Sequence, residues 1–299
     1  MSYDLYFYKR KSSSLSEEQV KDYLNKSNHL VLEENGNQWS YHNEETGVYF
    51  GIDLNEPNTD AEEIEIWDSF EDYENLNFCF TINFIRPNFF GYESFPILDE
   101  IIDDLDLYIL NMQDEIDPDN PQKFEKNYLG NQWIVQNERL VKDNFETFQV
   151  DFYSKENSDY IWNYQFNRNQ LQDNLNEDIF VAGYILLKNI NDGKIYRICV
   201  WPNHIPIIIP PVDFIIIQKN YKKFFRNVEE SGLVSIQQIE SKLGKYFEDF
   251  ECEIPNLKVV YQESADKIKN EFNDLKIESQ INDFGNLISL DRLVNVKPQ

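Results

Sequence analysis

One group of side chains that could do chemistry is a run of carboxylates between residues 99 and 106. Its members are Asp99, Glu100, Asp103, Asp104 and Asp106. In a helix, Asp99 would lie beside Asp103 and Glu100 beside Asp104, and such pairs of oxygen ligands can hold Mg²⁺ or Ca²⁺. The same spacing is ordinary on an exposed helix face. We therefore expect a solvated face here and keep a carboxylate-based, metal-dependent enzyme as the alternative.

Other residue types give little support to catalysis. The three histidines, His29, His42 and His204, have no second His or Cys at ligand spacing, which argues against a zinc site. His204 follows Trp201 in a loop, where we expect a packed structural histidine. The chain has no Gly-x-Ser-x-Gly motif, no Gly-rich phosphate loop and no dinucleotide fingerprint. The sequence therefore predicts no catalytic residue, no metal and no cofactor.

A second acidic region combines charge with large apolar side chains. Residues 55–75 contain nine acidic residues and no basic one, together with Ile64, Ile66, Trp67, Phe70 and Tyr73. Such a composition is expected of a surface that docks a basic protein, because charge speeds encounter and aromatic groups supply contact area. The candidate partner-binding residues are Glu62, Glu63, Glu65, Trp67, Asp68, Phe70, Glu71, Asp72, Tyr73 and Glu74. The alternative is a solvated acidic loop whose aromatic side chains cover a sheet edge.

The charge of the whole chain excludes other partners. The 299 residues include 54 acidic and 27 basic ones, for a net charge of −27. Residues 53–125 alone hold 21 acidic residues and two basic ones, a net charge of −19. Nucleic-acid phosphates and anionic membranes are bound by clustered Lys and Arg, so neither is an expected partner.

The first 115 residues predict an α+β domain. Residues 78–84 alternate so that Phe78, Phe80, Ile82 and Phe84 share one sheet face, which should be buried. A capping box at Ser16 predicts a helix start. The expected strands are 3–8, 38–43, 48–54, 78–84 and 105–110, with a second helix near 93–104. This order resembles a ferredoxin-like antiparallel sheet domain with one added strand.

The remainder of the chain predicts two further parts. A turn-rich stretch at 114–120 suggests a domain boundary. Residues 116–178 are expected to form a mostly helical connector, and residues 179–299 a second α/β domain with strands at 181–187, 194–201 and 212–218. Three widely spaced cysteines, no signal peptide and no apolar stretch long enough to span a bilayer favour a cytoplasmic protein.

Several short segments near the N-terminus are similar to a known group of proteins. They are MSYDLYF at 1–7, QWSY at 38–41, TGVYF at 46–50, NF at 77–78, NFIRPNFF at 83–90 and LDL at 105–107, with Glu93 and Gln113. Over about the first 115 residues the chain resembles an uncharacterised group of bacterial cytoplasmic proteins, similar to immunity proteins of polymorphic toxin systems. The resemblance implies a binding function and transfers no catalytic residue.

The sequence thus leads to an expected function and two alternatives. We expect a non-enzymatic cytoplasmic protein that neutralises a basic toxin or effector through the acidic, aromatic-bearing region. The first alternative is the carboxylate-based enzyme, with a site between the two α/β parts. The second is an acidic mimic of nucleic acid that blocks a DNA-binding protein. The oligomeric state is not predicted.

Overall fold

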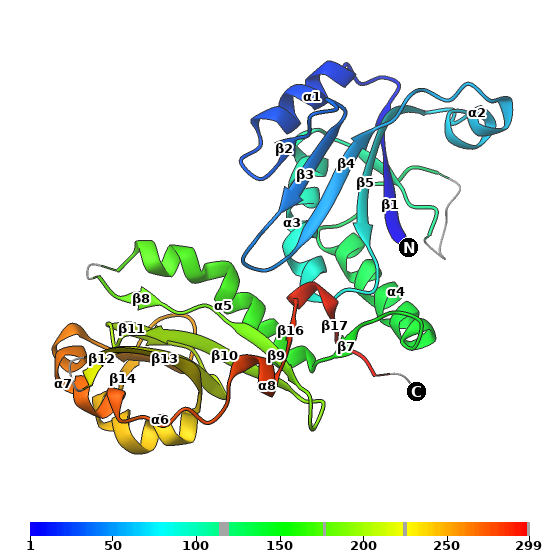
Figure 1. Ribbon diagram of the computed structural model, residues 1–299. Coiled ribbons are helices and arrows are strands. Elements are labelled where there is room, and N and C mark those ends of the chain that lie inside the picture. The colour runs from blue at the N-terminus through cyan, green and yellow to red at the C-terminus, as the bar shows by residue number, and fades with distance from the viewer. Residues whose placement is uncertain (114–119, 176–177, 224–225, 298–299) are drawn as a thin grey trace. The chain divides into compact units, whose positions relative to one another are not determined.

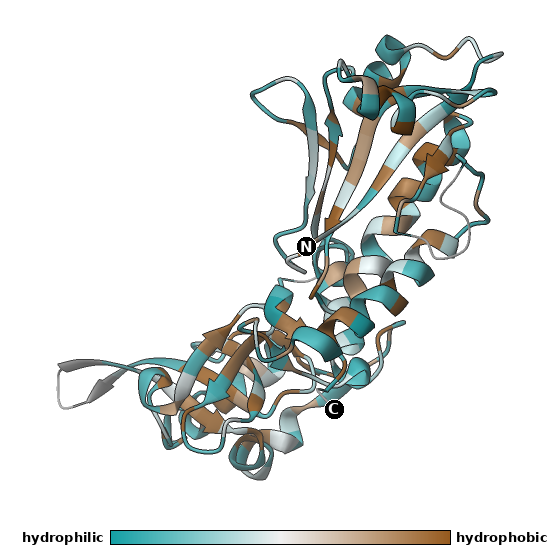
Figure 2. Cartoon of the chain, turned by 90° about the vertical axis from the view of Figure 1, so that its right-hand side faces the viewer, coloured by the Kyte–Doolittle hydropathy of each residue, from teal (hydrophilic) through white to brown (hydrophobic). Residues whose placement is uncertain are grey.

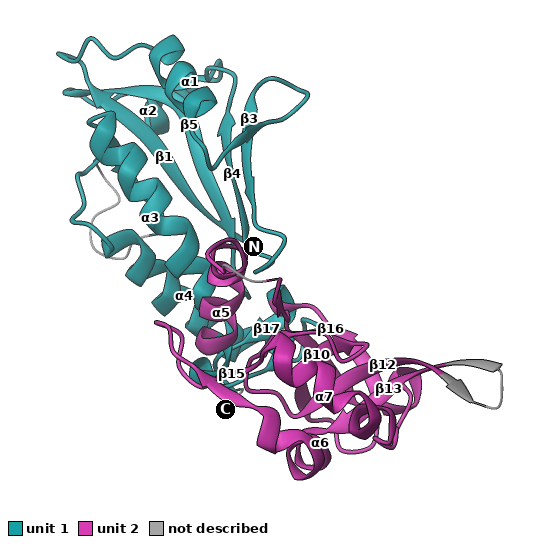
Figure 3. Ribbon diagram, turned by 90° about the vertical axis from the view of Figure 1, so that its left-hand side faces the viewer, with its two compact units in different colours: residues 1–158, 291–299 teal, residues 159–290 magenta. Residues whose placement is uncertain are grey.

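The chain has an α+β fold divided into two compact units. The computed structural model describes residues 1–113, 120–175, 178–223 and 226–297. Unit 1 consists of residues 1–158 and 291–299, and unit 2 consists of residues 159–290 (Figure 3). Within the described residues, no helix is both long enough and apolar enough to span a membrane.

Unit 1 contains a six-stranded, fully antiparallel sheet with the strand order β2-β3-β4-β5-β1-β6 (Figure 1). Its strands are β1 (Ser2–Arg10), β2 (Val31–Leu32), β3 (Gln38–His42), β4 (Tyr49–Leu54), β5 (Tyr73–Asn83) and β6 (Tyr108–Leu110). Its helices are α1 (Glu17–Lys26), α2 (Ala61–Trp67), α3 (Phe89–Asp104) and α4 (Tyr128–Asn144). The α+β prediction is therefore confirmed.

The predicted alternation in β5 places large side chains beneath α3. Phe78, Phe80 and Ile82 are buried, and the ring of Phe80 lies 5.5 Å from that of Phe95 on α3. Helix α1 covers the same face, and the Trp39 indole donates to Asn25 Oδ1 of α1 at 2.8 Å. Figure 2 shows this division, with brown apolar positions along the strands and teal loops at their ends. The aromatic residues thus form the core of unit 1.

A buried carboxylate holds the β3–β4 hairpin against α3. Glu93 Oε1 accepts hydrogen bonds from Tyr41 Oη at 2.6 Å, Asn43 Nδ2 at 2.8 Å and Thr46 Oγ1 at 3.0 Å. Burial and the bond to Glu93 raise the pKa of Tyr41. The phenol is therefore held as a donor over the whole physiological range.

Two glycines allow α4 to pack closely on α3. A Cβ atom at Gly91 would lie 3.0 Å from the fully buried ring of Trp133, and one at Gly130 would lie 3.0 Å from Phe95. Residues 116–178 therefore do not form a separate connector, because α4 buries Leu129 and Trp133 within unit 1. The boundary predicted near residue 115 falls in 114–119, which lie outside the described residues.

The end of the chain returns to unit 1. Strand β17 (Leu293–Val294) pairs in parallel with β7 (Asp151–Phe152). Asn295 Oδ1 accepts the backbone N–H of Asn88, which precedes α3, at 2.6 Å. The predicted domain 179–299 is therefore too long at its C-terminal end.

Unit 2 contains two sheets with the strand orders β13-β12-β10-β9-β16 and β14-β15-β11-β8. The strands of the first are β9 (Ile185–Asn189), β10 (Ile195–Pro202), β12 (Phe214–Lys223), β13 (Arg226–Ser235) and β16 (Gly285–Ile288). Those of the second are β8 (Phe180–Val181), β11 (Ile207–Ile209), β14 (Glu248–Phe250) and β15 (Leu257–Val260). Its helices are α5 (Lys155–Asp173), which begins in unit 1, α6 (Ile236–Leu243), α7 (Gln262–Asn273) and α8 (Ile281–Phe284).

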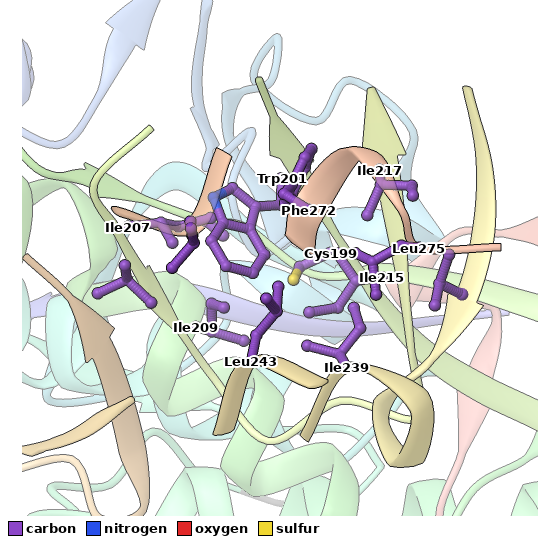
Figure 4. Close-up of a cluster of buried hydrophobic side chains, with 14 of the residues drawn as sticks. Cys199, Trp201, Ile207, Ile209, Ile215, Ile217, Ile239, Leu243, Phe272 and Leu275 are labelled. Atoms are coloured by element: carbon purple, nitrogen blue, oxygen red, sulfur yellow. The ribbon is translucent and has the colours of Figure 1, made fainter. Parts of the chain in front are cut away.

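The core of unit 2 is mainly aliphatic. Cys199, Trp201, Ile215 and Ile217 from the first sheet pack together with Phe272 of α7 (Figure 4). The strand predicted at 181–187 is wrong as a single element: it is split between β8 and β9, which belong to different sheets. A contact with a distant helix accompanies this break: the backbone N–H of Tyr184 donates to Gln165 Oε1 of α5 and not to a neighbouring strand.

We predict that Gly91→Ala lowers the free energy of unfolding by about 1–3 kcal/mol, because the added methyl group would overpack the fully buried ring of Trp133. The matched control is Gly51→Ala, where the nearest atoms lie at ordinary van der Waals distance, 3.7 Å or more. Urea denaturation followed by tryptophan fluorescence measures both. Equal stability of the two variants would contradict the close packing of α3 and α4.

We also predict that Glu93→Ala lowers the free energy of unfolding by about 2–4 kcal/mol, because it leaves buried donors without their acceptor. Glu93→Gln retains one acceptor oxygen and should cost less. Glu100→Ala removes an exposed carboxylate from the same helix and should change stability by less than about 0.5 kcal/mol. Thermal and urea unfolding of the three variants give the ranking, and an equal loss for Glu93→Ala and Glu100→Ala would refute it.

Candidate partner-binding surface

The ten sequence-predicted residues from Glu62 to Glu74 lie on α2, on the turn that follows it and at the start of β5 in unit 1, and are called the acidic surface below. Helix α2 begins after Asp60, whose carboxylate accepts the N–H of Glu62 at 2.9 Å. No residue of α2 is buried. The exposed members of the acidic surface are Glu62, Glu63, Glu65, Glu71, Asp72 and Glu74. These carboxylates therefore project their charge into solvent.

The aromatic members of the acidic surface contact the sheet. The ring of Trp67 lies 4.4 Å from that of Tyr6, Phe70 lies 5.4 Å from Tyr8, and Tyr73 lies 5.0 Å from Tyr108. Tyr8 Oη also donates to the backbone carbonyl of Trp67 at 2.8 Å. The aromatic side chains are half-buried and hold the acidic segment on β1 and β6.

Asp68 has a structural role within the acidic surface. Its carboxylate accepts hydrogen bonds from Asn58 Nδ2 at 3.0 Å and Asn75 Nδ2 at 2.9 Å. These bonds tie α2 to the loop before it and to β5. Burial and, secondarily, the charge of Asp68 raise the pKa of Tyr8. Asp68 is thus less available to a partner than the carboxylates on either side of it.

The exposed apolar groups are two isoleucines that the sequence analysis did not include among the site residues. Ile64 and Ile66 on α2 are 42% and 51% exposed. Both stand among the carboxylates of Glu62, Glu63 and Glu65. The sequence could have pointed to them, because both isoleucines stand directly beside glutamates in a short helix with three acidic residues out of seven.

Basic residues at the end of β1 and directly after it lie at the border of the acidic surface. Lys9 forms an ion pair with Glu74 at 3.3 Å, and Lys11 Nζ donates to the carbonyl of Phe70 at 2.7 Å. The guanidinium of Arg10 lies over the rings of Tyr73 and Tyr108. Among the described residues, Glu74 is the one member of the acidic surface with an ion pair. Asp72 interacts electrostatically with Arg10 without forming an ion pair.

The carboxylate run from Asp99 to Asp106 does not assemble into one cluster. Asp99 is only 7% exposed and accepts the N–H of Asn127 at 2.8 Å, at the start of α4. Burial is the main cause that raises the pKa of Asp99. Asp104 accepts from Tyr23 Oη at 2.7 Å, and Asp106 pairs with Lys123. In the described ranges, no three His, Cys, Asp or Glu side chains gather as a metal-binding group.

The remaining candidate residues have structural contacts. His204 Nδ1 lies 3.1 Å from the carbonyl oxygen of Ala265, and its ring packs against Phe272. Cys199 is fully buried, and burial raises the pKa of its thiol. A raised pKa keeps the thiol protonated and unreactive. Cys199 is therefore the inert core thiol that its apolar strand indicates.

Comparison of the chain with protein-family models, with curated proteins and with solved structures finds no significant match.

We predict that Trp67→Ala releases the acidic segment from the sheet, because it removes the contact with Tyr6. The expected result is at least about tenfold faster cleavage after Glu62, Glu63 and Glu65 by a glutamate-specific protease, since cleavage follows local opening and tenfold corresponds to about 1.4 kcal/mol. Mass spectrometry of timed digests measures the rate. Ile66→Ala truncates an exposed neighbour and serves as the control; equal rates in both variants would contradict the role of Trp67.

Proposed function

We propose that the protein is a non-enzymatic binding protein, an immunity protein or inhibitor that neutralises a basic toxin or effector. The acidic surface from Glu62 to Glu74 is its docking site. The observation that carries the proposal is the exposure of these carboxylates around two solvent-exposed isoleucines on α2. This arrangement provides both long-range attraction and a small apolar contact.

The contacts within the acidic surface assign different roles to its members. Glu62, Glu63, Glu65, Glu71 and Asp72 attract the partner. Ile64 and Ile66 make the apolar contact. Trp67, Phe70 and Tyr73 hold the surface in place, which reduces the entropy that would otherwise be lost on binding. A held surface supports tight binding better than a free acidic loop would.

The architecture of unit 1 and the N-terminal resemblance agree with this proposal. The strand order β6-β1-β5-β4, with α1 and α3 on one face, supports assignment of unit 1 to the ferredoxin-like class, with β2 and β3 as additions. The short N-terminal segments that resemble immunity-type proteins are consistent with the proposed cytoplasmic inhibitor, which would meet its target inside the cell.

The first test is affinity capture from a lysate of the source organism that also contains the product of the neighbouring gene. Capture is run in parallel at about 0.15 M and 1 M salt, where the screening length falls from about 8 to about 3 Å. The expected result is a basic protein that is retained at low salt, weakened at high salt, and no longer toxic or active once bound. If no protein is captured although the product of the neighbouring gene is present and soluble, the result would contradict the proposal.

We predict that reversing Glu62, Glu63, Glu65 and Glu71 to Lys slows association with the captured partner at least about tenfold and flattens its dependence on salt. The matched control reverses Glu240, Glu248, Glu251 and Glu253, which are exposed acidic residues of unit 2. Both variants change the net charge by the same amount. Stopped-flow or surface-plasmon measurements give the rates, and equal slowing by the two sets would remove the acidic surface as the docking site.

A further inference from the structure

A small pocket adjoins the acidic surface through Trp67, which belongs to both. The volume of the pocket is about 200 Å³. Its lining comes from β1, β5, α2 and the loop before α2, and consists of two aromatic residues, four asparagines and one glutamate: Tyr6, Trp67, Asn55, Asn58, Asn75, Asn77 and Glu56. Pockets that enclose a whole small molecule usually measure about 300–1,000 Å³, so this one is sized for a single side chain.

One wall of the pocket is aromatic. The ring centroids of Tyr6 and Trp67 lie 4.4 Å apart, and both side chains are only half-buried. Burial, with smaller contributions from Cys79 and Asp4, raises the pKa of Tyr6 to about 12, so the phenol stays neutral at physiological pH. Neutral aromatic rings attract cations through their π-systems. This wall therefore favours a cationic group with a flat face.

The asparagines of the pocket are oriented by Asp68, which does not itself line the pocket. Asn58 Nδ2 and Asn75 Nδ2 donate to the two oxygens of Asp68 at 3.0 and 2.9 Å. Asn75 Oδ1 accepts the backbone N–H of Asn77 at 2.9 Å, whereas Asn58 Oδ1 accepts no hydrogen bond from the described residues. Asn58 thus has its amide nitrogen held by a carboxylate and offers its oxygen as an acceptor.

Other polar groups of the pocket also lack partners in the described part of the chain. The Glu56 carboxylate has no ion pair there, and the side-chain amides of Asn55 and Asn77 have no hydrogen bond. Among the described residues, no Lys or Arg lines the pocket. Glu56 in the lining and Asp68, one hydrogen bond away, both carry negative charge. A cation with several N–H donors would therefore satisfy what the pocket offers.

We propose that this pocket receives one arginine side chain of the basic partner. The guanidinium lies against the rings of Tyr6 and Trp67. It donates to the side-chain oxygens of Asn58 and Asn77 and pairs with the carboxylate of Glu56. The inference rests on the proposed function, and it names the side chain that anchors the partner. Arginines in desolvated pockets are among the residues that contribute most to binding between proteins.

The chemistry of the pocket selects arginine over other side chains. A guanidinium is planar, weakly hydrated and carries five N–H donors in a fixed fork, so it stacks on aromatic rings and reaches several acceptors at once. The lysine ammonium is compact and strongly hydrated, so it would lose more water and cover less of the two rings. A neutral side chain would gain no attraction from Glu56 and Asp68.

The first test titrates blocked amino acids into the protein and needs no partner. The probes are N-acetyl-arginine methylamide, its lysine equivalent, and its citrulline equivalent, which has nearly the shape of arginine without the charge. Fluorine NMR of protein labelled with fluorotryptophan follows Trp67, whose signal is identified by its absence in Trp67→Phe. We expect blocked arginine to shift this signal saturably and the other two probes to bind at least about fivefold more weakly.

Two pocket variants and one control establish where the arginine binds. Glu56→Gln removes the carboxylate. Asn77→Gly removes a side-chain amide, and glycine readily keeps the positive φ of 61° that Asn77 adopts. Glu100→Gln removes the same charge as Glu56→Gln from an exposed position on α3. We expect each pocket variant to bind blocked arginine at least about threefold more weakly and the control to bind it unchanged. Circular dichroism verifies that all three are folded.

The outcomes separate this inference from the proposed function. No shift of the Trp67 signal, equal binding of the three probes, or equal loss in the control and the pocket variants would overturn the arginine pocket even if a basic partner is captured. The same holds if a captured partner binds the two pocket variants as tightly as it binds the unchanged chain. If blocked arginine binds but no partner is captured, the proposed function fails, and the assignment of the pocket to a partner fails with it.

Discussion

Burial of aromatic side chains between α3 and the sheet is the interaction on which the rest of unit 1 depends. Tyr3, Phe80, Phe95 and Trp133 are almost completely removed from solvent, and the burial of each such side chain stabilises the fold by about 1.5–3 kcal/mol. The opposing effect is large, because residues 53–125 of this unit carry a net charge of −19. Like charges at this density repel one another and destabilise a compact state. The aromatic core is the part of the unit able to outweigh that repulsion.

The repulsion also explains where the carboxylates lie. Those that enter the interior have specific donors, as Glu93 has Tyr41, Asn43 and Thr46. Many of the exposed carboxylates among the described residues stand on α2, on the turn that follows it and at the end of α3, where water screens them. The two negatively charged regions of unit 1 are thus consequences of one constraint. They differ in their surroundings, since α2 exposes two isoleucines, whereas the end of α3 lies beside a groove that residues of α1 also line.

Local sequence patterns predicted the structure correctly where interactions between residues close together in the sequence determine it. The alternation at Phe78, Phe80 and Ile82 gave the buried face of β5, and the capping box at Ser16 gave the start of α1. The same patterns failed to predict the structure where contacts between residues far apart in the sequence determine it. The break between β8 and β9 depends on Gln165, nineteen residues before the N–H that it accepts. The docking of α4 on α3 depends on glycines whose importance is visible only when both helices are in place.

The same limit applies to the candidate surface. Composition predicted that residues 62–74 carry exposed charge, because many carboxylates without cations cannot be buried. Composition could not show which apolar side chains already pack against other parts of the protein. Trp67, Phe70 and Tyr73 were expected to contact a partner, yet each lies against an aromatic ring of β1 or β6. Ile64 and Ile66 remain exposed because α2 packs only through its last residue and the turn beyond it.

The pairing of β17 with β7 has a consequence for how the chain folds as it is made. Unit 2 is inserted between two segments of unit 1, so the ribosome must synthesise all of residues 159–290 before residues 291–297 are available. Until then, the backbone N–H of Asn88 at the start of α3 lacks Asn295 as its acceptor. Domains generally fold in order of synthesis. Here the first domain to begin folding is the last to be completed, and unit 2 folds while unit 1 still has an open edge at β7.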